Sequence, residues 1–145
     1  MFDLVFRDFQ PGRKPFPLSP SGRAWFLLDG TAFPEVGWSD LPLSMLGAAA
    51  TAYKELRHGA GEARSFCFDG SFDLVYQRAA ERDLILIRGM QDGDECLGTT
   101  SVPLAVLRTA LLGAAEKMLA ALSDVEESGG RNSMILRKIL VDLAS

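Results

Sequence analysis

The chain has 145 residues and a formal net charge of -4, with 48% hydrophobic and 23% charged residues. This length and composition fit one folded domain over residues 1–145 and exclude a disordered chain. The acidic balance argues against binding to nucleic acid, and the lack of any apolar run of about 18 residues argues against a membrane protein.

The N-terminal part of the chain predicts two strands joined by a long loop. Apolar residues alternate with polar ones over 2–9, as in a half-buried strand, and this start lacks the cationic and apolar segments of a secretory signal. Residues 10–22 hold four of the seven prolines, which predicts an irregular surface connection. Residues 24–29 are apolar on both faces and predict a second strand, closed by the turn signal Asp29-Gly30.

A second loop, 31–38, leads to a helix that we expect to end near Arg57. Ser39 or Asp40 is the predicted N-cap, and Pro42 falls in the first turn, where its missing N–H is harmless. The expected buried stripe of this helix consists of Leu46, Ala49, Ala50, Tyr53 and Leu56. Because the helix is rich in alanine, we expect a second helix to pack closely against it.

Residues 65–77, SFCFDGSFDLVYQ, predict a β-hairpin. A loop of two residues would place Phe66 opposite Asp73 and split the aromatic face. A loop of three residues, 69–71, instead pairs Phe66 with Leu74 and places every large apolar side chain on one face. We therefore predict the three-residue loop, with the phenylalanines facing the core. The opposite, mostly polar face would then carry Ser65, Cys67, Asp73, Val75 and Gln77.

The second half of the chain continues with strands and then helices. Residues 84–87 predict a central strand, followed by the acidic loop 91–95 and a short strand over 95–100. The helix expected over 103–124 has an apolar arc of about half its circumference, which predicts contact with a sheet on one side and a helix on the other. We expect those neighbours to be the aromatic face of the hairpin and the alanine-rich helix. Its cap candidates are Thr100 and Ser101, and its central stripe is Leu104, Leu107, Leu111, Ala115, Met118 and Leu122.

The last helix is predicted from a cap at Asn132 or Ser133 to Leu143. Its apolar side chains must dock on the body of the protein or on a second copy, so this helix offers a surface for a homodimer. These side chains are Met134, Ile135, Leu136, Ile139, Leu140 and Leu143. Together the elements predict an α+β fold: an antiparallel sheet of about five strands, two long helices packed on one face, and a C-terminal helix.

No stretch of the sequence carries a catalytic motif. The only histidine, His58, falls at a helix end, and no serine lies in a nucleophile elbow. A zinc site is disfavoured by a single histidine and by the lack of a cysteine pair, and a Cys-His pair is disfavoured because no basic cluster adjoins either cysteine. We therefore predict no catalytic residue, no cofactor and no metal, and we expect a protein that is not an enzyme.

The two cysteines, Cys67 and Cys96, are too few for a disulfide framework. Cys67 lies in a strand pattern and is expected to behave as a small buried residue, with a bridge to Cys96 as the less favoured alternative. This cysteine usage predicts a reduced, cytoplasmic protein.

The most polar cluster is Asp92, Asp94 and Glu95 in the loop 91–95. It resembles a fragment of a calcium loop, but the twelve-residue pattern is incomplete, so a solvated turn or an acidic rim for a basic partner is favoured. Trp38 and Asp40 precede a helix, where a core side chain and a helix cap are the structural alternatives. In the binding hypothesis, these five residues form the candidate partner-binding set.

Three stretches carry a resemblance to a known class of protein. They are FPEVGWSD at 33–40 before a helix, the strand pair at 65–77, and the acidic QDGDE at 91–95. With these features, the chain resembles the small immunity proteins of bacterial toxin systems, over its whole length and in general build. The resemblance implies a non-enzymatic α+β module that neutralises a bacterial toxin by binding it.

Two other functions remain open from the sequence. A dimeric acidic chaperone for a secreted effector would also be a small α+β protein, and it would need a stable dimer and an exposed apolar groove. A small enzyme of unknown class is the third alternative. Both binding hypotheses name another protein as the partner, and neither involves nucleic acid or a membrane.

Overall fold

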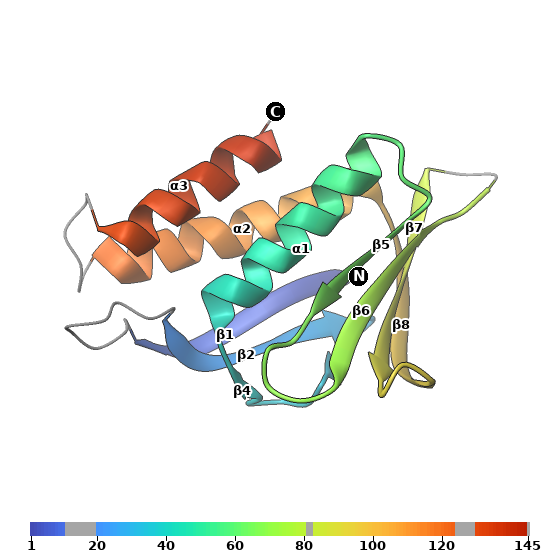
Figure 1. The fold of residues 1–145 in the computed structure, drawn as a ribbon, viewed down its shortest axis with the longest axis horizontal. Coiled ribbons are helices and arrows are strands. Elements are labelled where there is room, and N and C mark those ends of the chain that lie inside the picture. Colours follow the sequence, from blue (N-terminus) through green and yellow to red (C-terminus); the bar gives the residue numbers. More distant parts are fainter. Residues whose placement is uncertain (11–19, 81–82, 124–129, 145) are drawn as a thin grey trace.

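The computed structural model describes residues 1–10, 20–80, 83–123 and 130–144. Within these residues, the chain forms two antiparallel four-stranded sheets and three helices (Figure 1). The predicted α+β class and antiparallel pairing are confirmed, but the prediction of a single sheet of about five strands is wrong. The predicted proline-rich loop lies mostly outside the described residues.

The first sheet is built by tight local pairing around one central strand. Its strands are β1 (Phe2–Gln10), β2 (Ser21–Leu28), β3 (Thr31–Phe33) and β4 (Ser39–Asp40). β2 pairs with the other three. The predicted turn at Asp29-Gly30 joins β2 to β3, with φ of 50° and 85° at its two residues. The short strand β3 arises in the segment predicted as a loop, and β4 arises at the two positions predicted as the helix cap, because both strands find their hydrogen-bond partners on β2.

The second sheet is a meander in the order β5-β6-β7-β8. Its strands are β5 (Glu62–Phe66), β6 (Phe72–Arg78), β7 (Leu84–Gln91) and β8 (Glu95–Pro103). The predicted central strand is confirmed as β7, and the predicted short strand over 95–100 is longer. A helix separates the two sets of strands in sequence. Consecutive hairpins therefore pair each set internally, and two sheets form instead of one.

One glycine, Gly89, allows the two sheets to approach closely. Gly89 of β7 pairs with Gly98 of β8, and the ring of Phe33 from the first sheet lies directly on Gly89. A Cβ atom on Gly89 would lie 2.5 Å from a carbon of that ring, whereas one on Gly98 would lie 3.6 Å from Leu28 and Thr31. The two sheets can therefore pack this closely only because residue 89 has no side chain.

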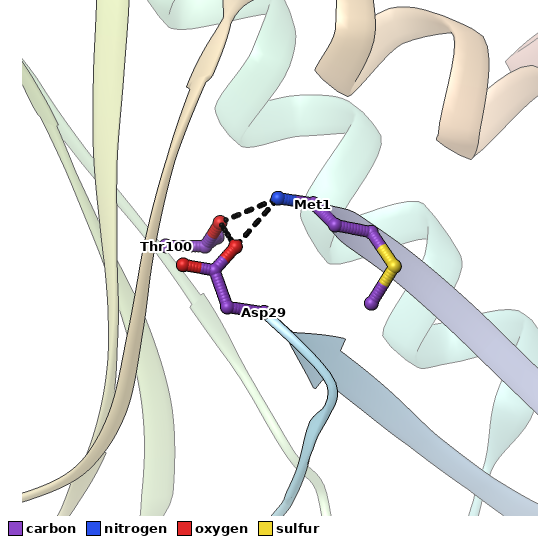
Figure 2. Close-up of polar contacts among 3 residues, drawn as sticks. All are labelled: Met1, Asp29 and Thr100. Atoms are coloured by element: carbon purple, nitrogen blue, oxygen red, sulfur yellow. Dashed lines mark hydrogen bonds and ion pairs between the residues drawn. The ribbon is translucent and has the colours of Figure 1, made fainter.

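A polar contact also joins the two sheets (Figure 2). The terminal ammonium of Met1 donates to Asp29 Oδ1 at 2.6 Å and to Thr100 Oγ1 at 3.0 Å, and Thr100 donates to the same carboxylate at 2.7 Å. The hydrogen bonds that Asp29 accepts lower its pKa, and the one from the Met1 ammonium has the largest effect. Asp29 belongs to the β2–β3 turn and Thr100 to β8, so the contact ties one sheet to the other.

The three helices are α1 (Pro42–Arg57), α2 (Leu104–Ser123) and α3 (Arg131–Ala144). In Figure 1 they lie together on one side of the molecule, with the first sheet below them and the second sheet at one end. None of the helices within the described ranges is long and apolar enough to cross a membrane.

The predicted course of α1 is confirmed and its predicted cap is wrong. Pro42 opens the helix, and the predicted stripe of leucine, alanine and tyrosine side chains is buried. The N-cap is Leu41, whose apolar side chain cannot make a capping bond, and the carboxylate of Asp40 accepts a hydrogen bond from the backbone of the hairpin at Phe68. The predicted caps of α2 are also wrong: Thr100 and Ser101 belong to β8, which runs directly into the helix.

Helix α2 packs against other elements on two sides, as its wide apolar arc predicts. Its predicted stripe is buried from Leu107 to Leu122, with Leu104 partly buried. α1 is one neighbour, as predicted, but the sheet neighbour is β1 and not the aromatic hairpin. The hairpin is unavailable to α2 because α1 itself packs on β5. α3 then covers α2 and α1 from the outside.

The predicted apolar stripe of α3 is split between two faces. Leu136, Ile139 and Leu143 are buried against the body, whereas Met134 and Ile135 are exposed, together with Val141. The residues predicted as caps, Asn132 and Ser133, are buried inside the helix. The docking on the body is thus confirmed for half of the stripe only.

Candidate functional site

The β5–β6 hairpin has a different register from the predicted one. Phe66 lies opposite Asp73, and Ser65 lies opposite Leu74. The backbone N–H of Cys67 donates to the carbonyl of Phe72 at 3.0 Å, which leaves a four-residue loop over 68–71. The predicted three-residue loop is therefore wrong, and the large apolar side chains do not share one face.

The close packing of α1 on β5 explains this register. Ala63, Ser65 and Cys67 face inward and are buried, and the Ser65 hydroxyl lies 2.7 Å from the hydroxyl of buried Tyr76. Only small side chains fit between a strand and a helix that approach this closely. The phenylalanines at 66 and 68 consequently face outward, with 55% and 52% of their surface exposed.

Asp40 fixes the hairpin loop from beneath. Its buried carboxylate accepts hydrogen bonds from the backbone N–H of Phe68, at 3.1 and 3.2 Å, and from that of Asp69, at 3.3 Å. It also accepts the Trp38 indole N–H at 2.8 Å and the N–H of Leu41 at 2.7 Å. One carboxylate therefore joins β4 and the start of α1 to the tip of the hairpin.

Aromatic rings support the same loop. The ring of Trp38 meets that of Phe72 edge-on, with 5.1 Å between centroids, and Phe72 meets Phe33 in the same way at 6.0 Å. Edge-to-face pairs of this kind add about 0.5–1.5 kcal/mol each beyond the area that they bury. The loop thus rests on a chain of rings that ends at Gly89, where the two sheets meet.

The β7–β8 turn lies against the hairpin loop. The backbone N–H of Asp92 donates to the carbonyl of Ser71 at 2.8 Å, and Asp92 and Gly93 turn the chain with φ of 53° and 78°. Asp92, Asp94 and Glu95 are all exposed. In Figure 1 the hairpin loop, β4 and this turn lie together along the lower edge of the molecule.

We call this surface the acidic aromatic end, defined by six exposed residues: Phe66, Phe68, Asp69, Asp92, Asp94 and Glu95. The three segments that build it, 33–40, 66–73 and 89–96, contain seven Asp and Glu residues and no Lys, Arg or His. Their net charge is thus -7, while that of the whole chain is -4, so the remaining residues sum to +3. The negative charge is concentrated at one end of the protein.

The five predicted site residues converge on this end. Asp92, Asp94 and Glu95 share the exposed turn, while Trp38 and Asp40 support the hairpin loop from inside. Sequence reasoning missed the two exposed phenylalanines because it placed them in the core. The signal that could have revealed them is the small-residue alternation at 63, 65 and 67, which suits a strand beneath an alanine-rich helix.

The chemistry of Cys67 does not favour nucleophilic catalysis. Burial, with smaller contributions from the carboxylates of Asp40 and Asp73, raises the pKa of its thiol to about 12. His58 follows α1 and precedes β5, whereas Cys67 follows the last residue of β5. The two residues therefore flank β5 at its two ends. Among the described residues, no three His, Cys, Asp or Glu side chains are grouped so that they could hold a metal ion.

We expect the two thiols to differ sharply in reactivity. At about pH 9, where an ordinary thiol is largely ionised, iodoacetamide should modify exposed Cys96 in the folded protein and leave Cys67 intact. Because the folded state favours the neutral Cys67 thiol, its contribution to stability should fall as the pH rises above the ordinary thiol pKa. Intact-mass spectrometry should show one adduct in buffer and two in denaturant; equal labelling rates in buffer would contradict the assignment.

Comparison with protein-family models, with curated proteins and with solved structures found no match to this chain. The chemistry of the acidic aromatic end is therefore the basis for a functional proposal.

Proposed function

We propose that this chain is a non-enzymatic protein-binding module that captures a basic protein through the acidic aromatic end. The observation that carries the proposal is the pair of half-exposed phenylalanines, Phe66 at the end of β5 and Phe68 in the adjoining loop, whose backbone is held by Asp40. Rigid aromatic side chains are the residues that most often dominate binding energy at protein interfaces. The carboxylates around them would steer a basic partner and reject acidic ones.

A bacterial toxin or nuclease of basic character is the partner class that we propose. Such an enzyme acts on an anionic substrate with a cationic surface, to which an acidic binding protein is complementary in charge. An immunity protein would act by covering that surface, and it would need no catalytic group of its own. A cytoplasmic location would suit this role.

Replacing both phenylalanines with serine should abolish capture of the partner without loss of the fold. We expect the Phe66→Ser/Phe68→Ser protein to melt within about 4 °C of the parent, since exposed side chains contribute little to stability. The measurement is affinity capture from a lysate of the source organism, with mass spectrometry of the proteins enriched by each form. The proteins lost from the variant should be basic.

The matched control is Val106→Ser, which removes an exposed apolar side chain from α2 and leaves the acidic aromatic end unchanged. This control should retain the same partner as the parent protein. A partner captured equally by the parent and by the double variant would overturn the proposal. So would a partner that is acidic and binds more tightly as salt concentration increases.

A dimeric chaperone for a secreted effector is the second candidate, and one observation favours it. α3 leaves Met134, Ile135 and Val141 exposed along its outer face, and this apolar stripe lies beside cationic side chains. A second copy docked on this stripe would form the homodimer that such a chaperone needs. Static light scattering of the intact chain tests this candidate, because a strictly monomeric protein would contradict it.

A further inference from the structure

A pocket of about 390 Å³ opens within the acidic aromatic end, between the hairpin loop and the β7–β8 turn. Its lining includes the residues Phe66, Phe72, Asp73 and Asp92. The volume falls at the small end of the range for ligand pockets, roughly 300–1,000 Å³. It suits a single side chain better than a whole small molecule.

The buried carboxylate of this pocket is only partly satisfied. Asp73 is 8% exposed, and the ion pair that it makes joins its Oδ2 to Arg64 Nη1 at 3.6 Å, which is too long for a hydrogen bond. Arg64 is itself 55% exposed and shares its charge with Glu62. Asp73 therefore keeps acceptor capacity for a donor that enters the pocket.

The other walls are suited to a flat cation. Phe66 lies opposite Asp73 in the hairpin, so its ring is on the same face of the sheet as this carboxylate, and an aromatic ring attracts guanidinium groups through its quadrupole. Asp92, at the exposed rim, supplies a second carboxylate, and its backbone is held by the hydrogen bond to Ser71. Among cationic side chains, arginine alone combines a planar face for stacking with a fork of donors for carboxylates.

We propose that this pocket binds one arginine side chain of the protein partner, with the guanidinium against the ring of Phe66 and its donors directed to Asp73 and Asp92. This inference rests on the proposed function and adds the chemical group that is recognised. The ring of Phe66 would supply the contact area, and the two carboxylates would supply the selection for positive charge.

The test is an NMR titration of the ¹⁵N-labelled full chain with Nα-acetyl-arginine methylamide. We expect saturable shifts at the backbone amides of the hairpin loop and the β7–β8 turn. The citrulline analogue, which has nearly the same shape and no charge, should produce no such shifts. Shifts of equal size with citrulline, tighter binding of the lysine analogue, or no saturable shift with arginine would each overturn the proposal.

Two variants assign the binding to the pocket. Asp92→Asn keeps a side chain that tolerates the positive φ at this position, and it should weaken arginine binding about tenfold, as expected for loss of a charge-assisted hydrogen bond. Asp73→Asn should have at least as large an effect. Asp83→Asn, an exposed carboxylate at the other end of β6 and β7, is the matched control and should bind as the parent does. An unchanged affinity in Asp92→Asn would overturn the assignment even if Asp73→Asn fails to fold.

The outcomes separate this inference from the proposed function. If arginine fails to bind while the double phenylalanine variant loses its protein partner, the pocket assignment is wrong and the binding function stands. If arginine binds and the partner is captured equally by parent and variant, the pocket is real and the proposed use of the acidic aromatic end is wrong.

Discussion

Gly89→Ala should destabilise the protein by about 1–3 kcal/mol, although alanine is ordinarily the better residue inside a strand. The new methyl group would lie within 2.5 to 2.8 Å of three carbons of the Phe33 ring, which is fully buried and in edge contact with Phe72. Because real Cβ atoms do not approach other atoms this closely, either the ring or β7 must shift. Urea unfolding followed by circular dichroism measures the loss.

Gly98→Ala is the matched control, because Gly98 lies directly opposite Gly89 in the same sheet. Its added methyl group would meet side chains at 3.6 Å, an ordinary contact distance, so we expect a change within about 0.5 kcal/mol of zero. Phe33→Leu combined with Gly89→Ala should recover part of the loss, as a double-mutant cycle would reveal. Equal effects of the two glycine substitutions would contradict the assigned contact between the sheets.

Asp40→Asn should be nearly as damaging as Asp40→Ala, with a loss of about 2–4 kcal/mol for either variant. Both carboxylate oxygens accept hydrogen bonds from N–H groups: Oδ1 from Leu41 and Phe68, and Oδ2 from Trp38, Phe68 and Asp69. An asparagine side chain would direct its own NH₂ group at some of these donors in either orientation. The free energy of unfolding in urea is the measurement.

Ser39→Ala, at the exposed neighbouring position, controls for changes in β4 and should be close to neutral. Trp38→Phe removes one of the donors and keeps a ring for the contact with Phe72, so its loss should be smaller than that of Asp40→Asn. If asparagine at position 40 proved harmless, the carboxylate would not be the tether of the hairpin loop. Arginine binding should weaken together with stability in Asp40→Asn, because the pocket depends on that loop.

The elements of the fold that depend on local pattern were predictable from the sequence. The strand over 2–9, the helix from Pro42 to Arg57 and the buried stripe of the helix after β8 follow from periodicity and proline position. The division into two sheets was not predictable, because β3 and β4 have three and two residues and exist only through their pairing with β2. Strands this short leave no periodic signal.

The candidate site was predicted in part for a similar reason. Its acidic turn and its tryptophan are visible in the sequence, but their proximity depends on the register of β6 and β7, which brings Asp92 to Ser71. The outward position of Phe66 was missed because the rule that large apolar residues face the core ignores the space available there. That space is set by the close packing of α1 on β5, and its only local sign in the sequence is the run of small residues at 63, 65 and 67.

The way in which Asp40 holds the hairpin loop has a consequence for how this protein could change its specificity. Its carboxylate contacts the backbone of positions 68 and 69 and makes no bond to their side chains. The loop would therefore keep its shape whichever residues occupy those two positions, proline excepted, because proline has no backbone N–H to donate. Evolution or protein design could exchange these two residues to bind a new target while the scaffold remains intact. The specificity of the surface could therefore change without a change in the fold.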